Sequence, residues 1–192
     1  MLAKEKWGPI RIIGDFRLTI KLRMIVAGGG TGGHFFPAQA IRKALQNKEV
    51  EVKYIGSRSG VESSYYSSDS DDALLLNIQG IQRHISVNSI INNILFPFRF
   101  LYSYIKTWVF LHEFKPHVVI GTGGYSSGLP LLVAIHKGIK TVIQEQNSFP
   151  GITTRYLASR VDKVCIAYHE SAIHLKKKIQ LSLGIRFERK SS

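Results

Sequence analysis

A glycine-rich stretch near the start of the chain has the residue types and spacing of a phosphate-binding turn. Residues 28–34 read Gly-Gly-Gly-Thr-Gly-Gly-His; they follow an apolar run, residues 24–27, and precede a helix-like pattern, residues 37–46. A glycine turn between a strand and a helix brings backbone N–H groups and a helix N-terminus together around an anion. The alternative is a tight turn without a ligand. No lysine follows the glycines as it would in an NTPase loop.

A second glycine stretch and a polar cluster follow two later predicted strands. Residues 121–128 read Gly-Thr-Gly-Gly-Tyr-Ser-Ser-Gly and lie between a strand at 116–120 and a helix at 129–137. Residues 144–147, Gln-Glu-Gln-Asn, directly follow a strand at 141–143. The carboxyl ends of parallel strands meet at one edge of a sheet, where α/β proteins bind ligands. We therefore expect all three segments to face one crevice.

The elements that position these segments alternate between strand and helix along the chain. Further strands are predicted at 51–56, 73–78 and 163–167, and further helices from Gly60 and at 153–159. This alternation is typical of an α/β fold with a doubly wound, Rossmann-like parallel sheet and right-handed crossovers.

The composition limits the classes of function. Of the net charge of +13, residues 1–23 carry +4 and residues 176–192 carry +5, so the excess lies mainly outside the motifs. Without a nucleic-acid-binding motif beside this charge, we expect no nucleic acid partner. The single cysteine, Cys165, excludes a disulfide framework.

The most apolar segment covers residues 89–114. Charged residues and Pro97 interrupt it, and each charge at the centre of a membrane span costs about 2.5–3.5 kcal/mol. We therefore predict a helix that is bent or begins again near Pro97. It is either a long buried helix or a helix whose exposed aromatic and basic residues contact an anionic membrane surface.

The three polar motifs together resemble those of the MurG-type glycosyltransferases of family 28. These motifs are Gly29 to His34 with Pro37, Gly121 to Gly128, and Glu145-Gln146-Asn147 with Gly151. Members of this family have the two-domain GT-B fold. They transfer N-acetylglucosamine from UDP-N-acetylglucosamine to undecaprenyl-pyrophosphoryl-muramoyl-pentapeptide (lipid I), which forms lipid II of peptidoglycan. The resemblance implies that this chain is the N-terminal, acceptor-binding half of such a fold.

The resemblance also implies roles for single residues. Both glycine turns are expected to hold the acceptor pyrophosphate, and Thr31, Gly32, Gly33 and Asn147 to help bind UDP-N-acetylglucosamine. The expected substrate-binding residues are Gly29, Gly30, Thr31, Gly32, Gly33, Gly121, Thr122, Gly123, Gly124, Tyr125, Ser126 and Asn147. Two residues depart from the family pattern: Gln144 stands where histidine is usual and Thr154 where asparagine is frequent.

His34 and Glu145 match positions that are important for activity in the family. A sugar hydroxyl must lose a proton as it attacks the donor, and an imidazole titrates near the operating pH. His34 is therefore the candidate base, with orientation of the turn or phosphate contact as its alternative role. Glu145 is expected to position either the acceptor or its own loop. No metal-ligand spacing occurs, so neither a metal nor a cofactor is expected.

The apolar segment matches the membrane-docking patch of the family's acceptor domain. The resemblance thus implies a peripheral protein on the cytoplasmic face of the bacterial plasma membrane. The residues expected in this patch are Phe96, Phe98, Arg99, Phe100, Lys106 and Trp108.

We expect three regions: a basic extension at 1–23 outside the core, an acceptor domain at 24–170, and an aberrant or disordered basic tail at 171–192. The donor domain of a GT-B enzyme is absent from this sequence, so activity is expected to need more than this chain. Family members continue with Thr-Gly-Asn-Pro-Val-Arg near this point. A codon string that encodes residues 182–190 yields those residues when it is read two bases later, which motivates the hypothesis of a frameshift.

Two alternatives stay open. The chain is either one subunit of a split, two-chain transferase with a separate donor-domain chain, or a non-catalytic domain that binds a lipid phosphate or a nucleotide.

Overall fold

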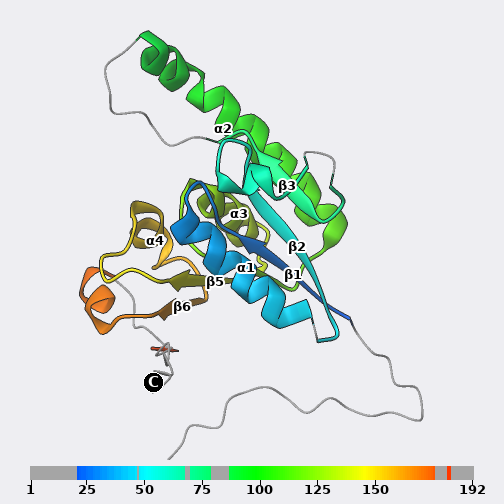
Figure 1. Ribbon diagram of the computed structural model, residues 1–192, viewed down its shortest axis with the longest axis vertical. Helices are drawn as coiled ribbons and strands as arrows, with labels where there is room; N and C mark the ends of the chain where they lie inside the picture. The colour runs from blue at the N-terminus through cyan, green and yellow to red at the C-terminus, as the bar shows by residue number, and fades with distance from the viewer. Residues whose placement is uncertain (1–20, 47, 68–69, 79–86, 176–180, 183–192) are drawn as a thin grey trace, which may run out of the picture.

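A computed structural model describes residues 21–46, 48–67, 70–78, 87–175 and 181–182, with the backbone alone for 87–93 and 181–182 (Figure 1). Seven parallel strands form one sheet in the order β3-β2-β1-β4-β5-β6-β7. The strands are β1 (Leu22–Ala27), β2 (Val50–Ser57), β3 (Ala73–Leu76), β4 (Val118–Gly121), β5 (Lys140–Glu145), β6 (Lys163–Ile166) and β7 (Leu181–Ser182). The helices are α1 (Gly32–Gln46), α2 (Val87–Phe114), α3 (Tyr125–His136) and α4 (Ile152–Leu157), with short 3-10 helices η1 (Val61–Ser64) and η2 (His169–His174). The predicted doubly wound parallel sheet is confirmed.

The strand order reverses between β1 and β4. The chain builds outward from β1 to β3, crosses back through α2, and continues outward from β4 on the other side of β1. Ala27 at the end of β1 is paired with Gly121 at the end of β4. Ligands of open α/β sheets bind at such a reversal, beyond the carboxyl ends of the strands. The fold therefore brings both glycine turns to this point.

Successive side chains along a strand point to opposite faces of the sheet, so the apolar core consists of two clusters, one on each face. In β1, Ile25 and Ala27 belong to the larger apolar cluster, which also contains residues of α2 and α3. Val26 belongs to the smaller cluster with Phe35 and Ala38 of α1. Buried parallel strands with helices on both faces are the reason for the continuous apolar runs in the sequence.

Two helices begin earlier than the sequence pattern predicts. The first was expected from about Pro37 and begins at Gly32; the second was expected from Leu129 and begins at Tyr125. In α1 the carbonyl oxygen of Thr31 accepts hydrogen bonds from the N–H groups of His34 and Phe35, which closes the first turn around the glycines. The second half of each glycine stretch is therefore the first turn of a helix.

One of the two alternatives predicted for α2, that the helix begins again near Pro97, is wrong. The helix is continuous over 28 residues with Pro97 inside it, and its N-terminal turns extend away from the sheet (Figure 1). Within the described part of the chain, none of the helices combines the length and apolarity needed to cross a membrane.

The ordered core reaches beyond the expected domain limits. Leu22 lies in β1, although residues 1–23 were expected outside the core, and residues 1–20 lie outside the described part. At the other end, Leu175 is 7% exposed within the larger cluster, and Leu181 in β7 pairs with Cys165. The expected limit at residue 170 therefore falls within packed structure. Residues 183–192, which hold most of the supposed frameshifted tail, are not described.

A buried carboxyl group fixes the turn between β1 and α1. Glu62 of η1 is 0% exposed, and its two oxygens lie 3.0 and 2.9 Å from the Gly30 amide nitrogen, which donates to them. The Ser57 amide also donates to Glu62. A Cβ atom at Gly29 or Gly60 would lie 2.1 and 2.2 Å, respectively, from a Glu62 oxygen, so glycine is required around this group. Glu62 thereby ties the turn to β2.

We predict that Glu62→Gln destabilises the protein. The amide has one acceptor oxygen in place of two and turns N–H groups toward the backbone N–H donors. An unsatisfied buried donor costs about 1–3 kcal/mol. Urea unfolding should show a free energy of unfolding lower by about this amount. The matched control is Glu170→Gln, at an exposed position in the first turn of η2. Equal stabilities of the two variants would contradict the anchoring role of Glu62.

Candidate functional site at the two glycine turns

The two glycine turns are in direct contact. A Cβ atom at Gly124 would lie 2.5 Å from the carbonyl oxygen of Gly29, and one at Gly123 would lie 2.5 Å from Nδ1 of His34. Gly123 and Gly124 also have φ angles of +101° and +77°, which side chains rarely adopt. The second turn therefore needs glycine for its conformation and for its approach to the first turn.

His34 and Thr122 hold the two turns together. The Thr122 hydroxyl donates to the carbonyl oxygen of His34 at 2.7 Å, and Nδ1 of His34 lies 3.1 Å from the carbonyl oxygen of Thr122. Nδ1 also lies 2.8 Å from Nε2 of Gln146, in the polar segment after β5. With the Thr122 carbonyl oxygen as its acceptor, Nδ1 carries the hydrogen, and the Gln146 nitrogen, which can only donate, lies beside it without bonding to this tautomer. The other ring nitrogen, Nε2, then has a free lone pair that can accept a proton.

A cavity of about 310 Å³ lies between the turns. Seven of the predicted site residues line it: Gly29, Gly30, Thr31, His34, Gly124, Tyr125 and Ser126. The Ser126 side chain is 1% exposed, and its hydroxyl has no hydrogen-bond partner among the described residues. A buried hydroxyl without a partner is costly, so a polar ligand in this cavity would satisfy it.

Two helix N-termini supply backbone donors beside the cavity. Helix α1 begins at Gly32 and α3 begins at Tyr125, and N–H groups in a first helical turn have no partner within the helix. The combined partial positive charge of two helix ends favours an anion. The Gly30 amide is not among these donors, because it already donates to Glu62. Glu62 itself is not among the residues that line the cavity.

Tyr54 supports the first turn from within the smaller core cluster. Its hydroxyl donates to the carbonyl oxygen of Gly28, and its side chain is 0% exposed. Burial, together with the nearby Glu62, raises the pKa of Tyr54 far above its usual range, although Arg42 opposes this effect. The phenol therefore stays protonated and remains a hydrogen-bond donor to the turn.

Glu145 and Asn147 lie outside the lining of this cavity and form a third loop. Glu145 is 1% exposed; it accepts hydrogen bonds from the backbone and side-chain nitrogens of Asn147 at 3.0 and 2.8 Å, and from the Gly151 amide at 3.4 Å. The Ser171 hydroxyl donates to the carbonyl oxygen of Asn147. Of the two alternatives for Glu145, these contacts favour positioning of its own loop.

Some predicted site residues occupy structural positions. Gly121 is the last residue of β4, where a Cβ atom would lie 2.5 Å from Leu131, and Thr122 is 0% exposed. The motifs in the sequence did not indicate Ser57, Ser59 and Ile78, which also line the cavity, or Glu62, which fixes the turn beside it. Ser57 ends β2 at the same edge as the turns, which was the available signal.

The expected membrane patch does not lie on one face of α2. Phe98 is 71% exposed and Trp108 is 38% exposed, whereas Phe96 and Phe100 are partly buried and line a cavity beside α3. Residues three or four apart share a helix face, so Phe96 and Phe100 form one face, and Phe98 belongs to another. The exposed apolar face instead contains Ile94, Phe98, Leu101, Ile105 and Val109.

The chain is similar to curated relatives over most of its length. A transferase of Flavobacterium psychrophilum is 43% identical over 148 residues, which are 76% of this chain and 39% of the relative. One of Bacillus subtilis is 39% identical over 155 residues, 80% of this chain and 42% of the relative. Both carry the name UDP-N-acetylglucosamine–N-acetylmuramyl-(pentapeptide) pyrophosphoryl-undecaprenol N-acetylglucosamine transferase. The chain thus spans about two fifths of the length of these relatives.

Solved structures agree with the sequence relatives. The crystal structure of Acinetobacter baumannii MurG aligns with a TM-score of 0.63 at 29% identity, over 79% of this chain and 43% of that one. A UDP-GlcNAc 2-epimerase from Methanocaldococcus jannaschii, at a TM-score of 0.55 and 14% identity, covers 81% of this chain and 41% of that one and shows the fold alone. The glycosyltransferase family 28 N-terminal domain matches residues 24–166, and the chain therefore belongs to this family.

Proposed function

We propose that the chain is the acceptor-binding half of a transferase that adds N-acetylglucosamine from UDP-N-acetylglucosamine to muramoyl-pentapeptide on undecaprenyl diphosphate. The observation that carries the proposal is the pair of glycine turns, which enclose a cavity with two helix N-termini and an unpartnered Ser126 hydroxyl. These groups suit the diphosphate of the acceptor. The matched region is only 39% and 42% of the length of the relatives with this activity in their names, so we propose that turnover needs a donor-binding domain as well.

His34 is the proposed proton acceptor. Transfer forms a bond between an acceptor sugar oxygen and the anomeric carbon of the donor, while the bond from that carbon to UDP breaks. The hydroxyl proton must leave, and a positioned base contributes about 10²–10⁴-fold to such a step. His34 lines the cavity, and the carbonyl oxygen of Thr122 accepts a hydrogen bond from its Nδ1–H, which leaves Nε2 for the proton. UDP leaves with the electron pair of the broken bond.

Helix α2 is proposed to hold the protein on the membrane that contains the acceptor, at the cytoplasmic face of the bacterial plasma membrane. Its exposed apolar face, formed by Ile94, Phe98, Leu101, Ile105 and Val109, follows the spacing of a single helix stripe. Lys106 and Lys137 lie over the rings of Tyr102 and Trp108 and add positive charge nearby. An apolar stripe with flanking cations fits an anionic lipid surface.

We predict that the chain transfers labelled N-acetylglucosamine to a lipid-linked muramoyl-pentapeptide only when a donor domain is supplied. The donor domain is the part of the Flavobacterium psychrophilum relative that this chain does not match, added as a fusion or as a separate polypeptide. Turnover in both formats would also support a split transferase.

In the fusion, His34→Asn should lower kcat by at least about 100-fold.

The matched control is His169→Asn, at an exposed position in η2. A base role also predicts that the acidic limb of the kcat–pH profile disappears in His34→Asn, whereas a role in orienting the turn predicts a lower rate with the same profile. Turnover by the chain alone would refute the need for a donor domain. If the fusion binds acceptor without turnover, the chain is a non-catalytic lipid-phosphate-binding domain.

We predict that Phe98→Ser and Leu101→Ser each weaken binding to phosphatidylglycerol vesicles by about tenfold or more. Burial of a large apolar side chain contributes about 1.5–3 kcal/mol, and about 1.4 kcal/mol is a factor of ten. Co-sedimentation measures the partition, and higher salt should reduce it. Ile173→Ser is the control, since Ile173 is 84% exposed in η2. Equal partitioning of all three variants and the parent chain would contradict the assignment of this face.

A further inference from the structure

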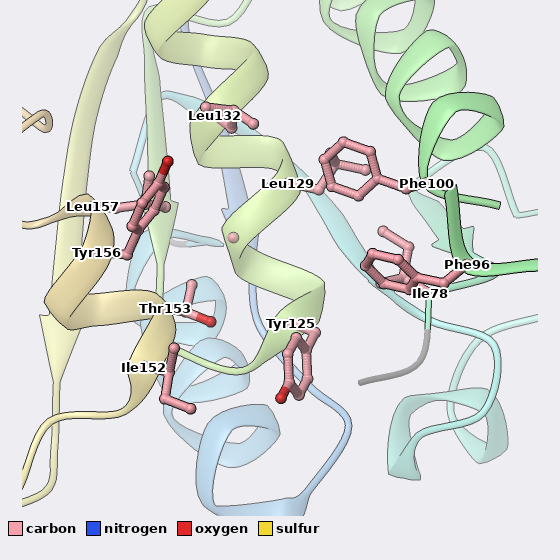
Figure 2. A pocket seen from close by; sticks show the side chains of 11 residues that line it. Ile78, Phe96, Phe100, Tyr125, Leu129, Leu132, Ile152, Thr153, Tyr156 and Leu157 are labelled. Carbon is pink, nitrogen blue, oxygen red and sulfur yellow. The ribbon is translucent and has the colours of Figure 1, made fainter. Parts of the chain in front are cut away.

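A second cavity of about 310 Å³ lies between α2, α3 and α4, and none of the described residues that line it has a charged side chain. Figure 2 shows Phe96 and Phe100 of α2 facing Leu129 and Leu132 of α3, with Ile152 and Tyr156 of α4 on the opposite side. We call this cavity the helix groove. Its described walls belong mainly to these three helices, and Ile78, which follows β3, also lines it.

The helix groove adjoins the cavity between the glycine turns. Ile78 and Tyr125 line both cavities. Tyr125 is the first residue of α3, directly after Gly124, and its ring lies at the end of the groove nearest the turns (Figure 2). A single ligand that extends past Tyr125 would therefore meet backbone donors at one end and apolar side chains at the other.

Large apolar side chains in the groove are exposed. Ile152 is 54% exposed, Tyr156 is 60% exposed and Tyr125 is 48% exposed. A cluster of exposed apolar side chains around a concave surface marks a binding site more often than isolated ones do. An apolar cavity of about 150 Å³ holds one benzene molecule, so a cavity of this size has room for about ten to twelve carbon atoms. That is the size of two isoprene units.

We propose that the helix groove binds the first isoprene units of the polyprenyl chain of a membrane lipid whose diphosphate lies between the glycine turns. This inference rests on the proposed function and names where the lipid part of the acceptor lies. The groove is lined by one face of α2, and the opposite, exposed stripe of the same helix is the proposed membrane contact, so both apolar surfaces belong to one helix. The apolar contacts select a diphosphate with a hydrocarbon substituent over one without.

The test uses the full 192-residue chain and two water-soluble probes, methyl diphosphate and geranyl diphosphate. Both carry the same diphosphate group and differ only in the hydrocarbon substituent. Isothermal titration should show that geranyl diphosphate binds at least about tenfold more tightly, because burial of two methylene-sized groups already accounts for a factor of this order. Ile152→Asn and Tyr156→Ser should each reduce this preference at least threefold and leave the affinity for methyl diphosphate unchanged.

The control variants are Ile173→Asn and Tyr168→Ser, at exposed positions in or beside η2 and outside the groove. They should keep the full preference, and thermal unfolding verifies that all four variants fold. If the parent chain binds both probes equally, or if groove and control variants lose the preference equally, the groove proposal is overturned while the diphosphate site stands. If neither probe binds, the proposed acceptor site fails and the groove proposal fails with it.

Discussion

The contact between the two glycine turns is the constraint on which the rest of the site depends. Strands β1 and β4 are adjacent only because the strand order reverses between them, and this places Gly29 against Gly124 with no room for a Cβ atom. The same proximity lets Thr122 bond to His34 and brings the first turns of α1 and α3 to one cavity. The protein uses one turn amide, that of Gly30, to fix the turn through buried Glu62, and leaves the helix N-termini for a ligand.

The sequence pattern predicted the parallel sheet, the approximate positions of β1 to β6 and the meeting of the two turns, because apolar runs and glycine clusters report directly on buried strands and tight turns. It missed β7, which lies in the segment expected to be a disordered tail. It did not predict that α1 begins at Gly32, since glycine and Pro37 are both poor evidence for helix continuity. The role of Glu62 depends on its contact with the Gly30 amide, which is 32 residues away in the sequence and meets Glu62 only in the fold. The division of α2 into a groove face and an exposed face likewise depends on where α3 packs.

The cavity, the helix groove and the exposed stripe of α2 form a sequence of surfaces with falling polarity. Tyr125 borders the first two, and α2 contributes to the second and the third on opposite faces, through Phe96 and Phe98. An amphiphilic ligand with a diphosphate head and a polyprenyl tail matches this order at each step. Glu145 holds the third loop, which follows β5. This loop places the Gln146 side chain beside His34 and so connects the proposed base to the strand next to β4.

Titration of the ¹⁵N-labelled chain with methyl diphosphate, observed through its backbone amide resonances, measures directly whether the two turns bind one anion. If the two turns form one anion site, the amides of Gly32 and Gly33 at the start of α1 and those of Tyr125 and Ser126 at the start of α3 will shift together with a single dissociation constant. Shifts confined to one turn, or two different dissociation constants for the two turns, would contradict the account.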